Sequence, residues 1–285
     1  MSGSAWSFDA IGTSWQIDTA NPLPSDVRAD VLGTIEQFDA LWSRFRPDSV
    51  VSRMAQAPGE YRLDGYILDF YDELFEATGG AVTPLIGQRL SDLGYDASYS
   101  LKPRRAPAAV GDWSAVRRAG DTVTLTEPAL IDIGAAGKGL LVDVVAGVLA
   151  GAGEHAATID ASGDLHHGGT AALRVALEHP LRPGQAIGVV ELQPGDALCG
   201  SATNRRAWAD ELHHVIDGRT GEPTRDVIAT WVLVPQSCMR ADGLATAHFF
   251  ADADVLAQRW DHQFVRVHAD GRVIWSQNLR GEIFR

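Results

Sequence analysis

Apolar residues in the first third of the chain recur at close to helical spacing. Between residues 25 and 46 they occupy positions 27, 31, 32, 35, 38, 41, 42 and 45, and Pro24 favours a helix start just before them. A second apolar-rich segment, 63–78, runs into a pair of glycines, which commonly end helices. We therefore predict two helices, 25–46 and 63–78, followed by a loop of sequence GGAVTPLIG.

Beyond about residue 120 the pattern changes to short runs of Val, Ile, Leu and Thr separated by Gly, Pro and Asp, which is typical of strands. Two helical patterns interrupt these runs, at about 139–150 and 241–258. The segment FVRVHADGRVIWSQ predicts a hairpin that turns at Ala269-Asp270-Gly271. The predicted strands are TVTLTEP, ALIDIG, ATIDASGD, LRVALEH, AIGVVEL, ALCGSA, HHVID and VIATWVLV.

Length and composition are those of a globular protein. The chain has 285 residues, 45% of them hydrophobic and 21% charged, which is enough to bury a large core. No repeat, linker or low-complexity segment divides it. We predict an α+β fold, a mostly antiparallel sheet flanked by helices, forming a single domain over residues 1–285 with one or two lobes.

The formal net charge of -13 disfavours partners that carry a negative surface. The arginines are too scattered to form a basic patch, so we expect no nucleic-acid partner. No apolar run is long enough to span a bilayer, and the N-terminal sequence lacks a secretory signal. We expect no membrane insertion and a cytoplasmic location. The two cysteines, Cys199 and Cys238, could pair, but we predict reduced thiols.

The segment LIDIGAAGKGLLVDVVAGVLAGAG passes from a β-like run at 130–133 through a glycine-rich turn into a helix. Apolar positions 140, 141, 144, 145, 148 and 149 predict its buried face, with Asp143 off that face. Free backbone N–H groups at the helix start, together with Lys138, suit a phosphate group. Tight packing of a helix on a sheet beside a surface lysine explains the same residues equally well. The spacing is not that of a P-loop.

The segment RADGLATAHFF contains two residues with hard oxygen atoms that could bind a metal ion. Asp242 and Thr246 are four residues apart near a predicted helix start, so they share one face of the helix. A carboxylate and a hydroxyl so placed suit Mg²⁺, whose other ligands are waters and phosphate oxygens. The alternative is an aspartate favoured by the helix dipole and a threonine bonded back to its own helix.

A histidine precedes a glycine-rich turn in HHVIDGRTGEP. His214 and Asp217 are three residues apart and meet only where the strand bends into the turn. A histidine in this position could act as a general base near neutral pH. The alternative is an Asx turn at Asp217-Gly218 beside an exposed histidine.

Taken together and in this order, these segments resemble the ApbE family of FAD:protein FMN transferases. The similarity runs from about Ile11 to about residue 258, and the combination of DIGAAGKG, HVIDGRTG and ADGLATA is its most specific part. The matching stretches are IGTSWQI, RFRPDSVVSRM, GGAVTPLIG, LIDIGAAGKGLLVD, IDASGDLHHGG, ALCGSA, HHVIDGRTGEP and ADGLATA.

The resemblance implies a fold related to the T-fold and a Mg²⁺-dependent cleavage of FAD. FMN passes to a Thr or Ser hydroxyl of an acceptor flavoprotein through a phosphoester bond, and AMP is released. By analogy, Asp242, Thr246 and the carbonyl of Ala135 hold the metal. His214 is the candidate base, and Asp217 shapes the turn beside it. The implied contacts of the flavin nucleotide are Ile11, Ala81, Val82, Thr83, Asp132, Lys138 and Ile216.

The chain also departs from the family pattern. Members commonly have Met, Asp, Thr, Gly and Pro at or near the positions where this chain has Ile11, Thr83, Leu85, Ala202 and Gly218. The loss of an acidic residue at 83 bears on the flavin contact or the metal site. Two other hypotheses therefore stay open: a Mg²⁺-dependent FAD pyrophosphatase that uses water as the acceptor, and a non-catalytic FAD-binding protein.

Overall fold

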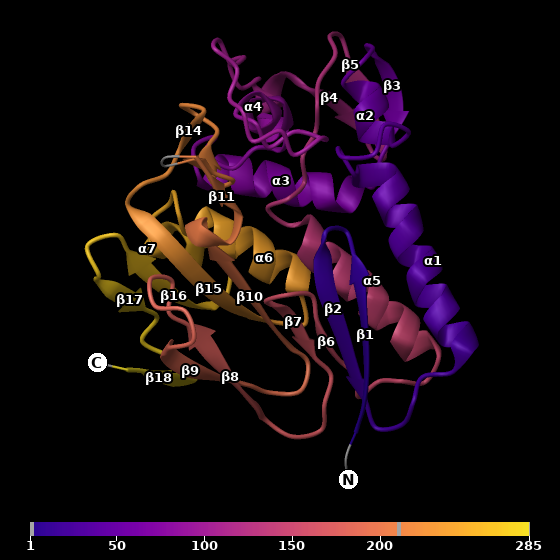
Figure 1. Ribbon diagram of the computed structural model, residues 1–285, viewed down its shortest axis with the longest axis vertical. Coiled ribbons are helices and arrows are strands. Elements are labelled where there is room, and N and C mark those ends of the chain that lie inside the picture. The colour runs from indigo at the N-terminus through magenta and orange to yellow at the C-terminus, as the bar shows by residue number, and fades with distance from the viewer. Residues whose placement is uncertain (1–2, 210–211, 285) are drawn as a thin grey trace.

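The computed structural model describes residues 3–209 and 212–284, so both ends of the predicted domain, 1 and 285, lie outside it. Its centre is an eight-stranded sheet in the order β1-β2-β6-β7-β10-β15-β16-β17, in which each pairing between neighbours is antiparallel (Figure 1). The predicted α+β fold is confirmed. The strands are β1 (Ser4–Ala10), β2 (Thr13–Thr19), β6 (Thr158–Asp160), β7 (Asp164–His167), β10 (Asp196–Ala202), β15 (Val227–Pro235), β16 (Gln263–His268) and β17 (Val273–Trp275).

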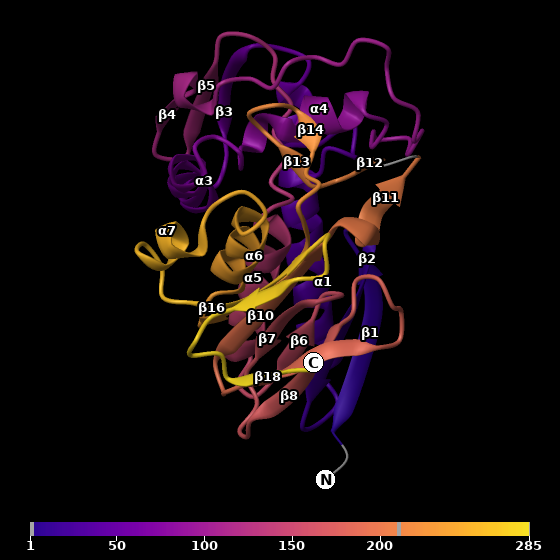
Figure 2. The same cartoon turned by 90° about the vertical axis from the view of Figure 1, so that its left-hand side faces the viewer.

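Two layers cover the two faces of this sheet (Figure 2). Helices α1 (Ser25–Trp42), α5 (Gly137–Gly151), α6 (Cys238–Ala247) and α7 (Ala253–Ala257) lie on one face. A small sheet of β8 (Leu173–Glu178), β9 (Ala186–Leu192) and β18 (Gly281–Ile283) lies on the other. The period of two along β10 explains the division, because Ala197 and Cys199 join the core under the helices, whereas Leu198 joins the core under the small sheet.

An upper lobe, residues 50–125, sits above the helical layer (Figure 1). It contains α2 (Val50–Met54), α3 (Gly65–Ala77), α4 (Gly87–Asp92), β3 (Gly59–Arg62), β4 (Arg117–Ala119) and β5 (Thr122–Leu125). Short strands β11 (Ala207–Trp208), β12 (Leu212–His213), β13 (Ile216–Asp217) and β14 (Glu222–Pro223) approach it from the sheet. One buried cluster contains Val123 of this lobe, Leu141 of α5 and Leu244 of α6, so the lobe and the body share a core. The single domain stays a prediction.

Several predicted boundaries are wrong. The helix predicted for 25–46 ends at Trp42, and the helix predicted for 241–258 is two helices, α6 and α7. ALIDIG forms no strand, because its backbone bonds to a neighbouring loop through Asp132 N and Pro84 O (2.8 Å). The predicted loop GGAVTPLIG contains a 3₁₀ turn at Pro84–Ile86, and HHVID is divided between β12 and β13. The terminal hairpin is confirmed, with Gly271 at a φ of 87° in its turn.

The prediction for α5 also needs a correction. Val144 was expected on its buried face and is 38% exposed, because the helix turns that side outward. Asp143 accepts hydrogen bonds from the first N–H groups of α6, those of Cys238 and Met239, at 2.8 and 2.9 Å. Asp143 therefore stabilises the start of the helix that carries Asp242 and Thr246.

The two cysteines are reduced in the structure. Their Sγ atoms are 3.3 Å apart, and both side chains are fully buried between β10 and α6. Burial raises the pKa of both thiols, that of Cys238 to about 12, which lowers their reactivity. We expect Ellman's reagent to titrate neither thiol in the native protein within minutes and both after denaturation. Rapid reaction in native buffer would contradict this burial.

None of the helices in the described part of the chain is both long and apolar enough to cross a bilayer.

Candidate functional site

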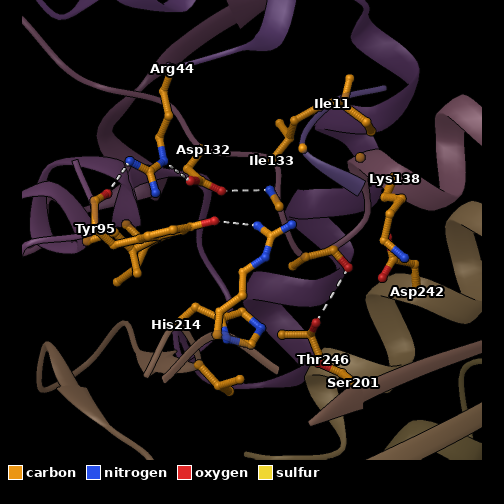
Figure 3. A pocket seen from close by; sticks show the side chains of 18 of the residues that line it. Ile11, Arg44, Tyr95, Asp132, Ile133, Lys138, Ser201, His214, Asp242 and Thr246 are labelled. Carbon is orange, nitrogen blue, oxygen red and sulfur yellow. Dashed lines mark hydrogen bonds and ion pairs between the residues drawn. The ribbon is translucent and has the colours of Figure 1, made fainter. Parts of the chain in front are cut away.

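A cavity of about 690 Å³ lies where the upper lobe meets the ends of β10 and α6 (Figure 3). Its walls come from segments that are far apart in the sequence. Of the predicted residues, all but Asp217 line it: Ile11, Ala81, Val82, Thr83, Asp132, Ala135, Lys138, His214, Ile216, Asp242 and Thr246.

Ile11 reaches the cavity from the tight turn between β1 and β2. Its φ is 46° and that of Gly12 is 73°, the two positive values of a type I′ hairpin turn. Positive φ strains a β-branched residue, and such strain is characteristic of functional positions. The turn places an apolar side chain in the wall of the cavity.

The segment 81–83 is held in place at two points. Thr83 caps the 3₁₀ turn at Pro84–Ile86, and Ala81 bonds to the turn after β13. Thr83 is buried, and its Oγ1 accepts a hydrogen bond from Leu85 N at 3.2 Å. Aspartate, which the resemblance implies near this position, is also a capping residue, so Thr83 fills that role without a charge. Gly218 N donates to Ala81 O at 2.8 Å, a bond that the proline implied by the resemblance could not make. A Cβ on Gly218 would lie 2.6 Å from Gly80 O.

Most N–H groups of the glycine-rich turn before α5 are already bonded inside the protein, which corrects the prediction that this segment presents a set of free N–H groups. The turn folds onto its own side chains, α3 and α6. Five of its N–H groups donate to a partner: Gly134 N to Asp132 Oδ1, Ala135 N to Tyr71 Oη, Ala136 N and Gly137 N to Ile133 O, and Gly139 N to Asp242 Oδ2.

Lys138 supplies a fixed cation in the cavity wall. Its Nζ lies 2.6 Å from Asp164 Oδ2 and donates to Ala161 O at 2.9 Å. Burial lowers the pKa of Lys138, but Asp164 and Asp242 outweigh it, and the pKa is raised overall. Burial raises the pKa of Asp242 well above its usual range, and the adjacent Asp164 acts in the same direction. This buried group of two carboxylates and one ammonium favours an additional cation.

Asp242 does not lie at the start of its helix. The helix begins at Cys238 with Ser237 as its cap, and Asp242 is 7% exposed, facing α5. Thr246 Oγ1 donates to Ala135 O at 3.5 Å rather than to its own helix (Figure 3). Both alternative explanations are therefore wrong, and the three predicted metal ligands line one cavity.

Gly139 sets the distance between α5 and α6. A Cβ at this position would lie 2.3 Å from Cys238 O and 2.8 Å from the Cβ of Asp242. Because both neighbours are fixed in a packed helix, neither can move away cheaply. We expect Gly139→Ala to reduce the free energy of unfolding by about 3 kcal/mol in urea titrations. Gly147→Ala, with nothing near its Cβ, is the control and should not destabilise. Equal stability of the two variants would contradict this packing.

His214 is half-buried in the cavity wall, with an inaccessible Nδ1, and is not fully exposed as the alternative explanation requires. Burial lowers its pKa to about 4, and the nearby Arg206 guanidinium acts in the same direction. Among the described residues, its Nδ1 has no hydrogen-bond partner. The imidazole is therefore neutral at pH 7 and free to accept a proton.

Asp217 lies outside the cavity lining. Its carboxylate accepts a hydrogen bond from Arg219 N at 2.9 Å and forms an ion pair with Arg219 Nη2 at 2.6 Å. This is the Asx turn that the sequence allowed. Asp217 shapes the turn beside β13, and a catalytic role for it stays a prediction.

Sequence reasoning missed the aromatic and arginine wall of the cavity. Phe45 and Tyr99 stack with centroids 5.1 Å apart, and Tyr95 stacks on Trp208 at 5.5 Å. Arg44 and Arg206 also line the cavity beside these rings. The signal for part of this wall was RFRPDS, which belongs to the resemblance, but no spacing rule links it to residues 95 or 206.

Known proteins show the same sequence pattern. The ApbE family matches this chain over residues 11–267. A Rhodobacter capsulatus protein named FAD:protein FMN transferase is 26% identical over an aligned length of 303 residues. The alignment covers 97% of this chain and 57% of the relative. A protein of the same name from Vibrio cholerae is 25% identical over an aligned length of 232 residues. That alignment covers 74% of this chain and 69% of the relative. This chain thus spans little more than half the length of the Rhodobacter relative.

Solved structures show the same fold. The crystal structure of an ApbE protein from Thermotoga maritima superposes with a TM-score of 0.83 at 21% identity, over 97% of both chains. The flavin transferase ApbE from Vibrio cholerae gives a TM-score of 0.78 at 22% identity, also over 97% of both chains. With the sequence match over most of its length, this chain belongs to the ApbE family.

Proposed function

We propose that this protein transfers FMN from FAD to a threonine or serine hydroxyl of an acceptor protein and releases AMP. The observation that carries the proposal is one cavity, lined by nearly all the residues expected to contact flavin, metal and the transferred proton. The names of the two relatives support it. The acceptor oxygen bonds to the phosphorus of FMN, the bond from that phosphorus to the bridging oxygen breaks, and AMP leaves with that oxygen.

The residues around Asp242 fit Mg²⁺. Asp242, Thr246 and the carbonyl of Ala135 offer hard oxygen atoms, the donors that Mg²⁺ prefers. With both carboxylates ionised, Asp164 and Asp242 would carry more negative charge than Lys138 balances, and a bound cation would favour that ionised state of Asp242. When bound, Mg²⁺ would neutralise charge on the pyrophosphate oxygens.

The chain's own groups then have distinct roles. Lys138, held by Asp164, offers a cation to the phosphates. His214, neutral because its pKa is low, takes the proton of the acceptor hydroxyl as the oxygen attacks. The cavity positions the two reactants, which is the main contribution a protein can make to phosphoryl transfer.

The test is incubation of the purified protein with FAD, with and without Mg²⁺, and with a Thr-containing acceptor domain. Chromatography follows FMN and AMP, and in-gel fluorescence follows flavin on the denatured acceptor. Magnesium-dependent AMP release with flavin on the acceptor establishes the transferase. Free FMN without labelled acceptor would instead indicate the pyrophosphatase, and bound but intact FAD the non-catalytic protein. The acceptor's identity and the cytoplasmic location stay predictions.

A further inference from the structure

Arg44 lies two residues beyond the end of α1, and its side chain is 2% exposed. Its Nε donates to Asp132 Oδ2 at 2.5 Å, and its Nη1 donates to the backbone oxygen of Tyr95 at 2.6 Å (Figure 3). Its Cζ lies 4.2 Å from the ring of Phe45 and 4.7 Å from that of Tyr95. The guanidinium is therefore fixed in one position between the end of α1, the upper lobe and Asp132.

The carboxylate of Asp132 is held from two sides. Oδ2 accepts from Arg44, and Oδ1 accepts from Gly134 N at 2.6 Å. The side chain is 13% exposed, and the residue lines the cavity. Asp132 thus presents a fixed anionic edge to whatever occupies the cavity, with the positive charge of Arg44 beside it in the same wall.

A buried ion pair of this kind does little for stability by itself. The cost of removing both charges from water roughly cancels their attraction, whereas loss of one partner leaves an unpaired buried charge. The unpaired charge here would be a carboxylate facing a cavity that already contains Asp242. Any ligand with phosphate groups would meet that charge as a repulsion.

We propose that Arg44 is a positioning residue for the flavin nucleotide. It fixes the Asp132 carboxylate so that it can accept a hydrogen bond from the ligand, and it cancels the charge that would repel the pyrophosphate. The inference rests on the proposed function, because FAD is the ligand whose phosphates the charge balance must admit. Arg44 acts through Asp132, so its effect must disappear when that carboxylate is removed.

A double-mutant cycle tests this dependence. FAD and riboflavin binding are measured by titration calorimetry for wild type, Arg44→Met, Asp132→Asn and the double variant. We expect Arg44→Met to bind FAD roughly 10- to 100-fold more weakly, and riboflavin at most about threefold more weakly, because riboflavin carries no phosphate. In the double variant, FAD affinity returns to within about fivefold of Asp132→Asn. A merely structural role for Arg44 predicts no such rescue.

Arg118→Met is the matched control. Arg118 is 14% exposed, pairs with Asp69 and Asp72, and lies 5.7 Å from the ring of Trp113, but it does not line the cavity. It should bind FAD as wild type does. Arg44→Lys covers the case in which Arg44→Met does not fold. It keeps the charge but loses the fixed planar fork, so we expect an FAD affinity between those of Arg44→Met and wild type.

Four results overturn the inference while leaving FAD binding by the wild type intact. They are wild-type affinity in Arg44→Met, equal losses for FAD and riboflavin, no rescue in the double variant, and a loss in Arg44→Lys as large as that in Arg44→Met. A wild-type protein that binds no FAD would instead overturn the proposed function.

Discussion

Replacing Asp242 with alanine is expected to abolish flavin transfer while the fold stays intact. Asp242 is the charged member of the proposed metal set, and charge neutralisation by a metal contributes several kcal/mol to phosphoryl transfer. We expect a loss of roughly 10³-fold or more in kcat, because each tenfold corresponds to about 1.4 kcal/mol. The free energy of unfolding should change by less than about 2 kcal/mol. The substitution leaves Gly139 N without its hydrogen-bond acceptor, which destabilises the fold. It also removes the cost of burying a carboxylate, which stabilises the fold by a similar amount.

Asp143→Ala is the matched control, because Asp143 binds the first N–H groups of α6 and does not line the cavity. It should lose about 1 kcal/mol of stability and keep its activity. Turnover with FAD and acceptor measures the first effect and urea unfolding the second. The thermal shift caused by Mg²⁺ gives a readout independent of turnover, and it should vanish in Asp242→Ala. An active Asp242→Ala variant would rule out the metal assignment.

Replacing His214 with leucine is expected to lower kcat by roughly 10² to 10⁴-fold, the usual contribution of a general base. FAD binding should change little, because the ring has no partner at Nδ1 among the described residues. Leucine also suits a buried position. Single-turnover transfer to the acceptor measures the effect, and FAD titration by calorimetry separates binding from chemistry.

The wild-type pH profile gives a second check on His214. Only the neutral imidazole accepts a proton, and its pKa is about 4, so kcat should hold down to about pH 5 and fall below that. The stability effect has the same direction. The folded pKa lies below the unfolded value of about 6.5, so the unfolded state takes up the proton first. Stability is lost as pH falls from 6.5 towards 4, and His214→Leu should reduce that loss. An acid limb of kcat near pH 6.5 would show that the titrating group is not this buried ring.

The sequence predicted most elements because their cores follow simple periods. β10 contributes to both cores through Ala197, Leu198 and Cys199, and a strand buried on both faces appears in the sequence as a short continuous apolar run. The end of α1 was missed because Phe45 continues the helical period. Only the structure shows that Arg44 leaves the helix to reach Asp132, 88 residues away.

The site was predictable only as separate pieces. Local rules indicated Lys138, His214, Asp242 and Thr246, and the resemblance supplied Ile11 and the loop at 81–83. Neither could show that most N–H groups of the glycine turn are already bonded, because two of the partners, Tyr71 and Asp242, come from α3 and α6. Contacts between distant segments leave no periodic trace in a single sequence.

The cavity draws its walls from segments that span most of the chain, from Ile11 to Phe250. During synthesis the β1–β2 hairpin leaves the ribosome long before α6, which carries the proposed metal ligands. A growing chain therefore has no complete cavity until α6 has packed against α5 and β10. We therefore expect FAD to bind only after the whole segment from Ile11 to Phe250 has folded.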